Sequence, residues 1–248
     1  MKHYCIDHLT TYLSIIEEDQ RRNDMGDAPL EAYLFRGQSA DYPLIPKLCR
    51  HIKQEILERE AQILAEFKRA NPLLLYPYQL LDDWDCLTLG QHYGLPTRFL
   101  DWSTNALTAL WFALKQRGDT ADDAIVWILR TKREHYVEEL TGKSPFELER
   151  SMFFRPRILK QRINNQSGVF SVLCDEDLLN GVRLDEMPQF NANLIKVSIP
   201  NKAHKQLLAQ LHTLGIHAFS IFPELDGLCA YLEWKYTSGF EKDHTSPF

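Results

Sequence analysis

The sequence lacks any hydrophobic run long enough to cross a membrane. Its longest apolar stretch, residues 107–114, is interrupted by a threonine and falls far short of the ~20 residues that a spanning helix needs. No apolar signal core follows Met1. With 44% hydrophobic and 25% charged positions among 248 residues, the composition excludes a disordered chain and fits one large domain. We therefore expect a cytoplasmic protein without a membrane anchor.

Cysteine is scarce, and the familiar cofactor motifs are missing. Five widely scattered cysteines, an odd number with no CxxC pair, exclude a disulfide framework and a zinc finger. We expect each to be a reduced, buried, small apolar side chain. No GxGxxG, P-loop, GxSxG or HExxH pattern occurs. No cluster of aspartate, glutamate and histidine suggests a metal site, so no metal is predicted.

The chain also lacks a general excess of positive charge. Its formal charge of -6 argues against a protein that coats nucleic acid over its whole surface. One local exception is residues 150–162, which contain Arg150, Arg155, Arg157, Lys160 and Arg162 and no acidic residue. Such a segment can bind phosphate on a nucleotide or a nucleic-acid strand, or it can be a solvated basic face. Both readings stay open.

Hydrophobic periodicity predicts an α+β fold. Helices are expected at 5–21, 52–70, 78–92, 105–116, 201–214 and 226–235, and strands at 32–35, 124–129, 168–173 and 194–199. Ile6, Leu9, Leu13 and Ile16 would form the buried stripe of the first helix. This order predicts a mixed or antiparallel sheet flanked by helices rather than βαβ repeats. We divide the chain into an N-terminal helix (1–29), one domain (30–240, with a helical insertion at about 50–92) and a tail (241–248).

The first polar cluster is residues 35–38, with the sequence FRGQ. An arginine at the end of a strand can present its planar guanidinium to a phosphate or a carboxylate. Gly37 lets a ligand or another backbone approach closely, and Gln38 adds a polar side chain. In the alternative reading, Arg36 pairs with a buried aspartate and joins two segments of the fold.

The second polar cluster is residues 91–103, which lead into the helix expected at 105–116. Its polar and aromatic side chains are Gln91, His92, Tyr93, Thr97, Arg98, Asp101, Trp102 and Ser103. A histidine can donate a hydrogen bond or act as a base near neutral pH, and an aromatic ring can stack on a flat ligand. Alternatively, Asp101 caps the following helix and pairs with Arg98, or Ser103 or Thr104 provides that cap.

The order of these motifs resembles the FRG-domain family, which is named for a Phe-Arg-Gly motif. The resemblance is carried by residues 35–38, 44–50, 91–103 and 109–113, and by the later segments 161–170 and 222–228. It covers about residues 30–235. Proteins of this kind occur in bacteria and phages, which implies a role in conflict or phage defence. The family largely lacks an assigned activity.

A looser resemblance links the chain to the ADP-ribosyltransferase fold. Arg36 resembles that fold's first element, and Ser103 and Thr104 followed by 109–113 resemble its second. The third element would fall near Gln166, but this chain has no glutamate there. Asp101, Glu176 or Asp226 could supply the missing carboxylate. The resemblance implies NAD as a substrate, with its pyrophosphate on Arg36.

Together these resemblances predict a protein that binds NAD or a related nucleotide and acts as an ADP-ribosyltransferase or NAD glycohydrolase. The alternative is a non-catalytic module that binds nucleic acid or a protein partner through residues 150–162. The predicted catalytic residues are Arg36, His92, Asp101 and Gln166. The predicted ligand-binding residues are Gly37, Gln38, Gln91, Tyr93, Thr97, Arg98, Trp102, Ser103, Arg157 and Arg162.

Overall fold

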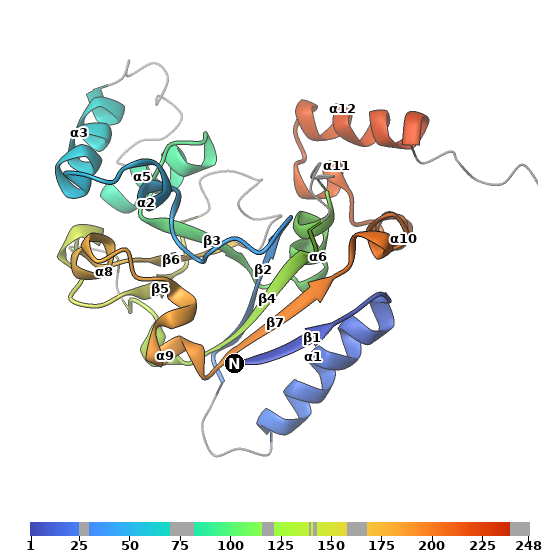
Figure 1. The fold of residues 1–248 in the computed structure, drawn as a ribbon. Coiled ribbons are helices and arrows are strands. Elements are labelled where there is room, and N and C mark those ends of the chain that lie inside the picture. Colours follow the sequence, from blue (N-terminus) through green and yellow to red (C-terminus); the bar gives the residue numbers. More distant parts are fainter. Residues whose placement is uncertain are drawn as a thin grey trace, which may run out of the picture.

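A seven-stranded mixed sheet forms the centre of the protein (Figure 1). The computed structural model describes residues 1–24, 30–69, 82–115, 122–138, 140, 143–157 and 168–238. The strands are β1 (Lys2–Cys5), β2 (Ala32–Gln38), β3 (Phe99–Ser103), β4 (Ala124–Thr131), β5 (Met152–Phe154), β6 (Gly168–Val172) and β7 (Leu194–Ile199). Their order is β1-β7-β4-β2-β3-β6-β5. The β1–β7 pair is parallel and the other neighbours are antiparallel, which confirms the expected α+β class.

Helices flank this sheet. They are α1 (Leu9–Asp24), α2 (Lys47–His51), α3 (Ile56–Arg69), α5 (Asp83–His92), α6 (Ala106–Leu114), α8 (Asp175–Leu179), α9 (Pro188–Asn191), α10 (Asn201–Thr213), α11 (Ala218–Ile221) and α12 (Leu225–Glu233). Single 3-10 turns lie at Arg133–His135, Pro145–Glu147 and Leu184–Glu186, and a π-helical segment spans Trp234–Ser238. No helix of the described segments is long and apolar enough to span a bilayer.

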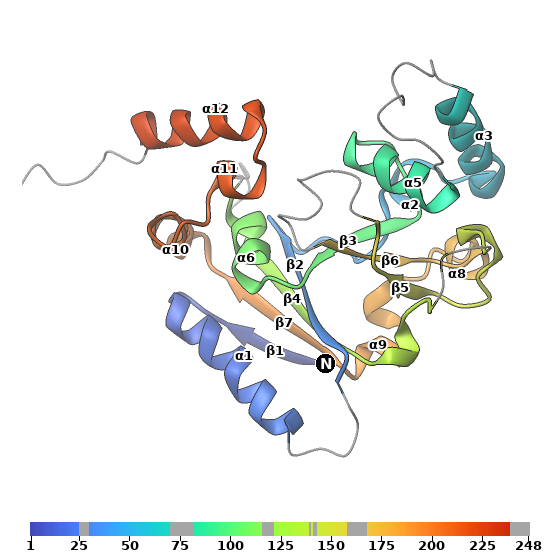
Figure 2. The same cartoon turned by 180° about the vertical axis from the view of Figure 1, so that it is seen from behind.

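The core lies on both faces of the sheet because the central strands are buried on both sides. In β4, Val126 and Ile128 pack with α1, α6 and α10, whereas Ile125 and Trp127 pack on the opposite face. This alternation follows from the two-residue period of a strand. A third apolar cluster joins α3 and α5 to β5 and β6. Figure 2 shows α1 beside β1 at one end of the molecule and α3 with α5 at the other.

The sheet divides where β2 meets β3. Among the described residues, these two strands pair at a single position, Phe35 with Ser103, whereas β2 and β4 pair over their full length. Figures 1 and 2 show β3, β6 and β5 diverging from the direction of β4 and β7. The split opens a space between Arg36 and Asp101, which lie just beyond the shared pair.

Several expected elements need correction. The first helix begins at Leu9 rather than residue 5, since Lys2–Cys5 pairs with β7. Leu13 is 44% exposed and so does not belong to the buried stripe. The helix expected at 52–70 begins at Ile56 and follows the separate helix α2. β1, β3 and β5 were not predicted, because strands this short carry too few residues to show a clear alternation.

The cysteine prediction is partly wrong. Cys49, Cys86 and Cys174 are buried free thiols, but Cys5 and Cys229 are exposed. Both exposed residues lie in elements with one solvent-facing side, β1 and α12. Burial raises the pKa of the Cys49 and Cys86 thiols to about 11, which keeps them protonated and unreactive at neutral pH.

Candidate functional site

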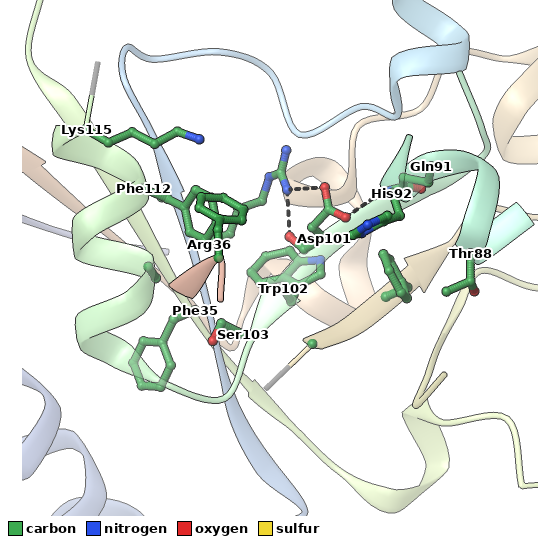
Figure 3. A pocket seen from close by; sticks show the side chains of 15 residues that line it. Phe35, Arg36, Thr88, Gln91, His92, Asp101, Trp102, Ser103, Phe112 and Lys115 are labelled. Atoms are coloured by element: carbon green, nitrogen blue, oxygen red, sulfur yellow. Dashed lines mark hydrogen bonds and ion pairs between the residues drawn. The ribbon is translucent and has the colours of Figure 1, made fainter. Parts of the chain in front are cut away.

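A pocket occupies the split in the sheet (Figure 3). Its cavity volume is about 300 Å³, which is at the lower end of the range for small-molecule sites. Five elements and the turn after α11 contribute side chains to it. The lining residues are Phe35, Arg36, Gly37, Thr88, Gln91, His92, Asp101, Trp102, Ser103, Ala109, Phe112, Lys115, Gly168, Phe170 and Phe222.

Arg36 fills the point where the two strands separate. Its Nη1 donates a 2.6 Å hydrogen bond to the backbone carbonyl of Asp101 and lies 3.7 Å from Oδ2 of that residue. The side chain is 15% exposed, whereas that of Asp101 is 65% exposed. The expected alternative is confirmed in part, since Arg36 pairs with an aspartate and joins β2 to β3, but that aspartate is exposed rather than buried. An ion pair with an exposed carboxylate contributes little to stability, so this pair does not by itself account for the arginine.

The guanidinium of Arg36 has unused hydrogen-bonding capacity. Its buried Nε has no acceptor within reach among the residues that the structure describes. Burial lowers the pKa of Arg36, the nearby Asp101 carboxylate opposes this shift, and Arg50 adds to it. The arginine stays protonated at neutral pH even so. A buried donor without an acceptor is costly, and a ligand oxygen would satisfy it.

A short hydrogen-bond chain orients the Asp101 carboxylate. Gln91 Nε2 donates to Asp101 Oδ1 at 2.6 Å. The hydroxyl of Thr97, a buried residue, donates to Gln91 Oε1, which fixes the amide with its nitrogen toward Asp101. Thr97 does not line the pocket and acts only through Gln91. The carboxylate therefore lies between Gln91 and Arg36, as Figure 3 shows.

The turn after α5 explains the Gly-Leu-Pro part of the central motif. Gly94 adopts a positive φ of 88°, which favours glycine. Leu95 N donates to the carbonyl of Gly90, and Gly94 N donates to that of Gln91, which is the Schellman pattern of a helix end. The helix thus ends where Gln91 and His92 reach the pocket. Tyr93 follows this end, is 64% exposed, and packs edge-on against His92 outside the pocket lining.

Each residue of the FRG motif has a different structural role. Phe35 is buried in the core that includes α6. Arg36 points into the split. A Cβ at Gly37 would lie 1.9 Å from the carbonyl oxygen of Ala109 in α6, so only glycine allows this helix to pack against β2. The close approach expected at Gly37 is therefore that of another backbone.

Arg98 belongs to the core rather than to the pocket. Its side chain is 1% exposed and forms hydrogen bonds to Glu60 and Asp175 and to the carbonyls of Pro145 and Leu173. This network joins α3 and α8 to the start of β3. The expected pairing of Arg98 with Asp101 is wrong. The two residues are three positions apart in an extended segment, so their side chains point to opposite faces.

Three other predicted residues are structural as well. Gln38 is buried and accepts a hydrogen bond from Trp127 Nε1. Trp102 is buried against Phe153 and donates to Ser171, although part of it reaches the pocket lining. Ser103 Oγ accepts from the backbone N–H of Asn105. The N-cap of α6 is Asn105, and not Ser103, Thr104 or Asp101 as expected.

The basic segment is paired with protein groups where the structure describes it. Arg150 donates to the carbonyl of Glu134, and Arg155 pairs with Glu31. Arg157 bridges Asp82 and Asp85 beside α5 and does not line the pocket. Lys160, Arg162 and Gln166 lie outside the described residues. All three described arginines therefore have partners within the protein, although each side chain is also exposed to solvent.

Four lining side chains, one cationic and three aromatic, were not among the predicted site residues. They are Lys115 and the rings of Phe112, Phe170 and Phe222. Thr88 was also missed, and its buried Oγ1 is without a partner in the described part of the chain. Phe112, Phe170 and Phe222 lie in the segments 109–113, 161–170 and 222–228 that carry the family resemblance, but only tertiary packing shows that their rings meet at one pocket.

One family model matches part of the chain. Residues 31–122 match the FRG domain, and this span holds β2, β3, α5 and α6, which carry most of the pocket. No curated protein and no solved structure matches the chain. Among the described residues, no group of three or more His, Cys, Asp or Glu side chains is arranged to hold a metal ion.

Proposed function

This chain contains an FRG domain, and we propose that the pocket beside its Phe-Arg-Gly motif binds NAD or a related nucleotide. The observation that carries the proposal is the guanidinium of Arg36, with a buried, unpaired Nε in a pocket that aromatic rings also line. An arginine of this kind suits a phosphate. Phenylalanine rings such as Phe170 suit the flat base of a nucleotide.

The catalytic part of the proposal rests on Asp101. Cleavage of NAD breaks the bond between ribose C1′ and the nicotinamide nitrogen, and the electron pair of that bond neutralises the nicotinamide ring. A nucleophile then bonds to C1′ and loses a proton; water gives hydrolysis, and a macromolecular acceptor gives ADP-ribosyl transfer. A carboxylate stabilises the cation-like sugar between these events. Asp101 is exposed to the pocket and oriented by Gln91 and Arg36.

In this proposal His92 is the general base. It lines the pocket near Gln91, at the end of α5, where an imidazole can accept the proton of the incoming nucleophile. Gln166 stays a predicted ribose ligand. A role in phage defence stays a prediction from the family resemblance.

The alternative is a non-catalytic module that binds nucleic acid through residues 150–162. The exposed Arg150, Arg155 and Arg157 each have a partner within the protein, whereas the buried Nε of Arg36 has none among the described residues, and this contrast favours the pocket. Salt dependence separates the two, since binding to several backbone phosphates weakens steeply as ionic strength rises. Binding of a nucleotide in a preformed pocket is less sensitive.

A thermal-shift panel with NAD, ADP-ribose and ATP tests the binding. We expect NAD and ADP-ribose to raise the melting temperature in a saturable manner, because a ligand that binds only the folded state stabilises it. The Asp101→Asn variant then tests catalysis. It should still bind ADP-ribose but release nicotinamide from NAD at least ~100-fold more slowly than the native protein, the size of effect seen when one electrostatic stabiliser is lost.

A protein that shows no shift with any of the three nucleotides would contradict the binding proposal. Binding without nicotinamide release, by the native protein and the Asp101→Asn variant alike, would leave a nucleotide-binding module and remove the catalytic claim. The Asp41→Asn variant is a matched control, because Asp41 is an exposed carboxylate that pairs with Lys196 away from the pocket.

A further inference from the structure

Lys115 is a cation of the pocket that the proposed function has not yet used. It lies at the C-terminal end of α6, and its ammonium sits over the rings of Phe112, Phe222 and Trp111 at 4.7, 5.4 and 5.5 Å from their centroids. Such rings attract an ammonium group through their electron-rich faces. Figure 3 shows the Lys115 side chain extending across Phe112 toward the guanidinium of Arg36.

The three rings form a platform that fixes the direction of Lys115. Phe112 and Phe222 meet edge to face with centroids 5.9 Å apart, and Trp111 packs against both. Phe222 comes from the turn between α11 and α12, where a Cβ at Gly227 would lie 1.9 Å from the Phe222 carbonyl oxygen. Because this turn is so closely packed, tertiary structure rather than local sequence places the ammonium.

The charge of the pocket is positive although the protein is acidic overall. Among the described lining residues, Arg36 and Lys115 are positive and Asp101 alone is negative, within a chain of formal charge -6. Asp101 is already held by Gln91 and Arg36. Two cations directed toward one space repel each other, and an anion between them converts that repulsion into attraction.

We propose that Arg36 and Lys115 form a two-cation clamp for a diphosphate group, so that the pocket selects nucleoside diphosphates over monophosphates. The inference rests on the proposed nucleotide-binding function and specifies the ligand class of the same pocket. A diphosphate can place one phosphate at each cation, whereas a monophosphate satisfies one cation and leaves the other unmatched. ADP, ADP-ribose and NAD all carry this group.

Calorimetric titration of the full chain with ADP, AMP and inorganic pyrophosphate tests the clamp. The native protein should bind ADP at least about tenfold more tightly than AMP, the effect expected for one added charge-assisted contact. Lys115→Met should bind ADP about tenfold less tightly than the native protein does, whereas its affinity for AMP should change less than about twofold. Lys115→Arg should keep the preference. Lys202→Met, a change at an exposed lysine on α10, is the matched control.

Each outcome separates the clamp from the function on which it rests. Equal weakening of ADP and AMP by Lys115→Met, or no weakening of either, overturns the clamp while Arg36-dependent nucleotide binding stands. Failure of the native protein to bind ADP, AMP and pyrophosphate overturns both. Pyrophosphate that binds as tightly as ADP, and depends on Lys115, supports the clamp but contradicts a nucleotide as its occupant. Unchanged melting temperatures confirm that the variants are folded.

Discussion

Two arginines of the polar motifs, Arg36 and Arg98, have opposite environments, and this difference indicates different roles. Arg36 keeps a buried Nε without a partner in the described chain and faces a pocket. Arg98 is enclosed by Glu60, Asp175 and two backbone carbonyls, with Phe146 against its guanidinium. An arginine with unmet hydrogen-bonding capacity is suited to a ligand, and a fully satisfied one stabilises the fold.

We predict that Arg98→Met destabilises the protein by about 3–5 kcal/mol, because it leaves the buried Glu60 carboxylate without its partner. The double variant Arg98→Met, Glu60→Leu should recover much of this loss, since neither buried charge remains. Urea unfolding of the three proteins measures the differences. A double variant no more stable than Arg98→Met would show that the cost does not come from the unpaired carboxylate.

Thr97 offers a test of the chain that orients Asp101. Thr97→Val removes the hydroxyl that fixes the Gln91 amide, so we expect slower nicotinamide release with little change in ADP-ribose affinity. Thr97→Ser keeps the hydroxyl and should behave like the native protein. Initial rates and titrations of both variants check this. Equal loss of rate in the two variants would point to packing of the threonine methyl instead.

At the residue scale, sequence reasoning located the polar motifs but not the face on which each side chain lies. Within 91–103, five residues line the pocket, namely Gln91, His92, Asp101, Trp102 and Ser103, whereas Thr97 and Arg98 are buried and do not line it. The spacing could not distinguish them, because β3 was not predicted and its two-residue alternation was therefore unknown.

At the scale of elements, the pocket exists because one pair of strands stops pairing. β2 and β3 share the Phe35–Ser103 position and then diverge, and Arg36 donates to a carbonyl of β3 across the opening. The helix α6, which follows β3, packs against β2 at Gly37 and closes one side. The motif Phe-Arg-Gly thus specifies a core anchor, a pocket residue and a helix contact in successive positions.

We predict that Gly37→Ala forces α6 away from β2, because the new Cβ would lie 1.9 Å from the Ala109 carbonyl oxygen and 2.6 Å from Ala113 N. Overpacking against backbone costs about 1–3 kcal/mol or more. The melting temperature should fall and nucleotide binding should weaken with it. Gly181→Ala is an informative comparison, since that glycine has no atom within 4 Å of a built Cβ. Because Gly181 has a positive φ of 61°, an alanine there would strain the backbone but would not clash with a neighbouring atom.

Long, strongly patterned elements were the predictable part of the fold. The strand at 194–199 was predicted with its exact bounds, and the buried strand predicted from residue 124 is β4, an interior strand of the sheet. The strands β1, β3 and β5 and the single-turn helices were missed because so few residues do not establish a period, whereas the equally short β6 was predicted from its mostly apolar run. The split in the sheet could not be predicted, because it depends on β3. That strand lies within the polar segment 91–103, whose pattern does not indicate a strand.

At the scale of the whole molecule, a stack of rings fastens the C-terminal helices to α10. His212 lies against Trp234 with ring centroids 3.4 Å apart, and His217 lies against Tyr231 at 4.1 Å. Burial, followed by the nearby His217, lowers the pKa of His212 to about 4. Burial also lowers the pKa of His217. These helices adjoin Phe222, so the stack supports one wall of the pocket.

This stack predicts how stability depends on pH. The folded state binds a proton at His212 less readily than the unfolded state, whose histidine has a pKa of about 6.5. The unfolded state therefore gains protons first, and stability falls as pH decreases from about 6.5 toward 4. His212→Phe should have a shallower fall over this window. Melting curves between pH 7.5 and 4.5 check it, with His3→Asn, at an exposed histidine, as a control that keeps the native slope.

Calorimetric titration of the native protein and of Arg36→Ala with ADP-ribose tests the proposal that Arg36 makes the split in the sheet a nucleotide site. We predict saturable binding to the native protein, and about a 10- to 100-fold loss in Arg36→Ala, which corresponds to one lost hydrogen-bonded charge contact. The melting temperature without ligand should change little, because Arg36 bonds chiefly to one backbone carbonyl and an exposed carboxylate. Equal affinity in the two proteins, or an Arg36→Ala protein that fails to fold, would contradict the account.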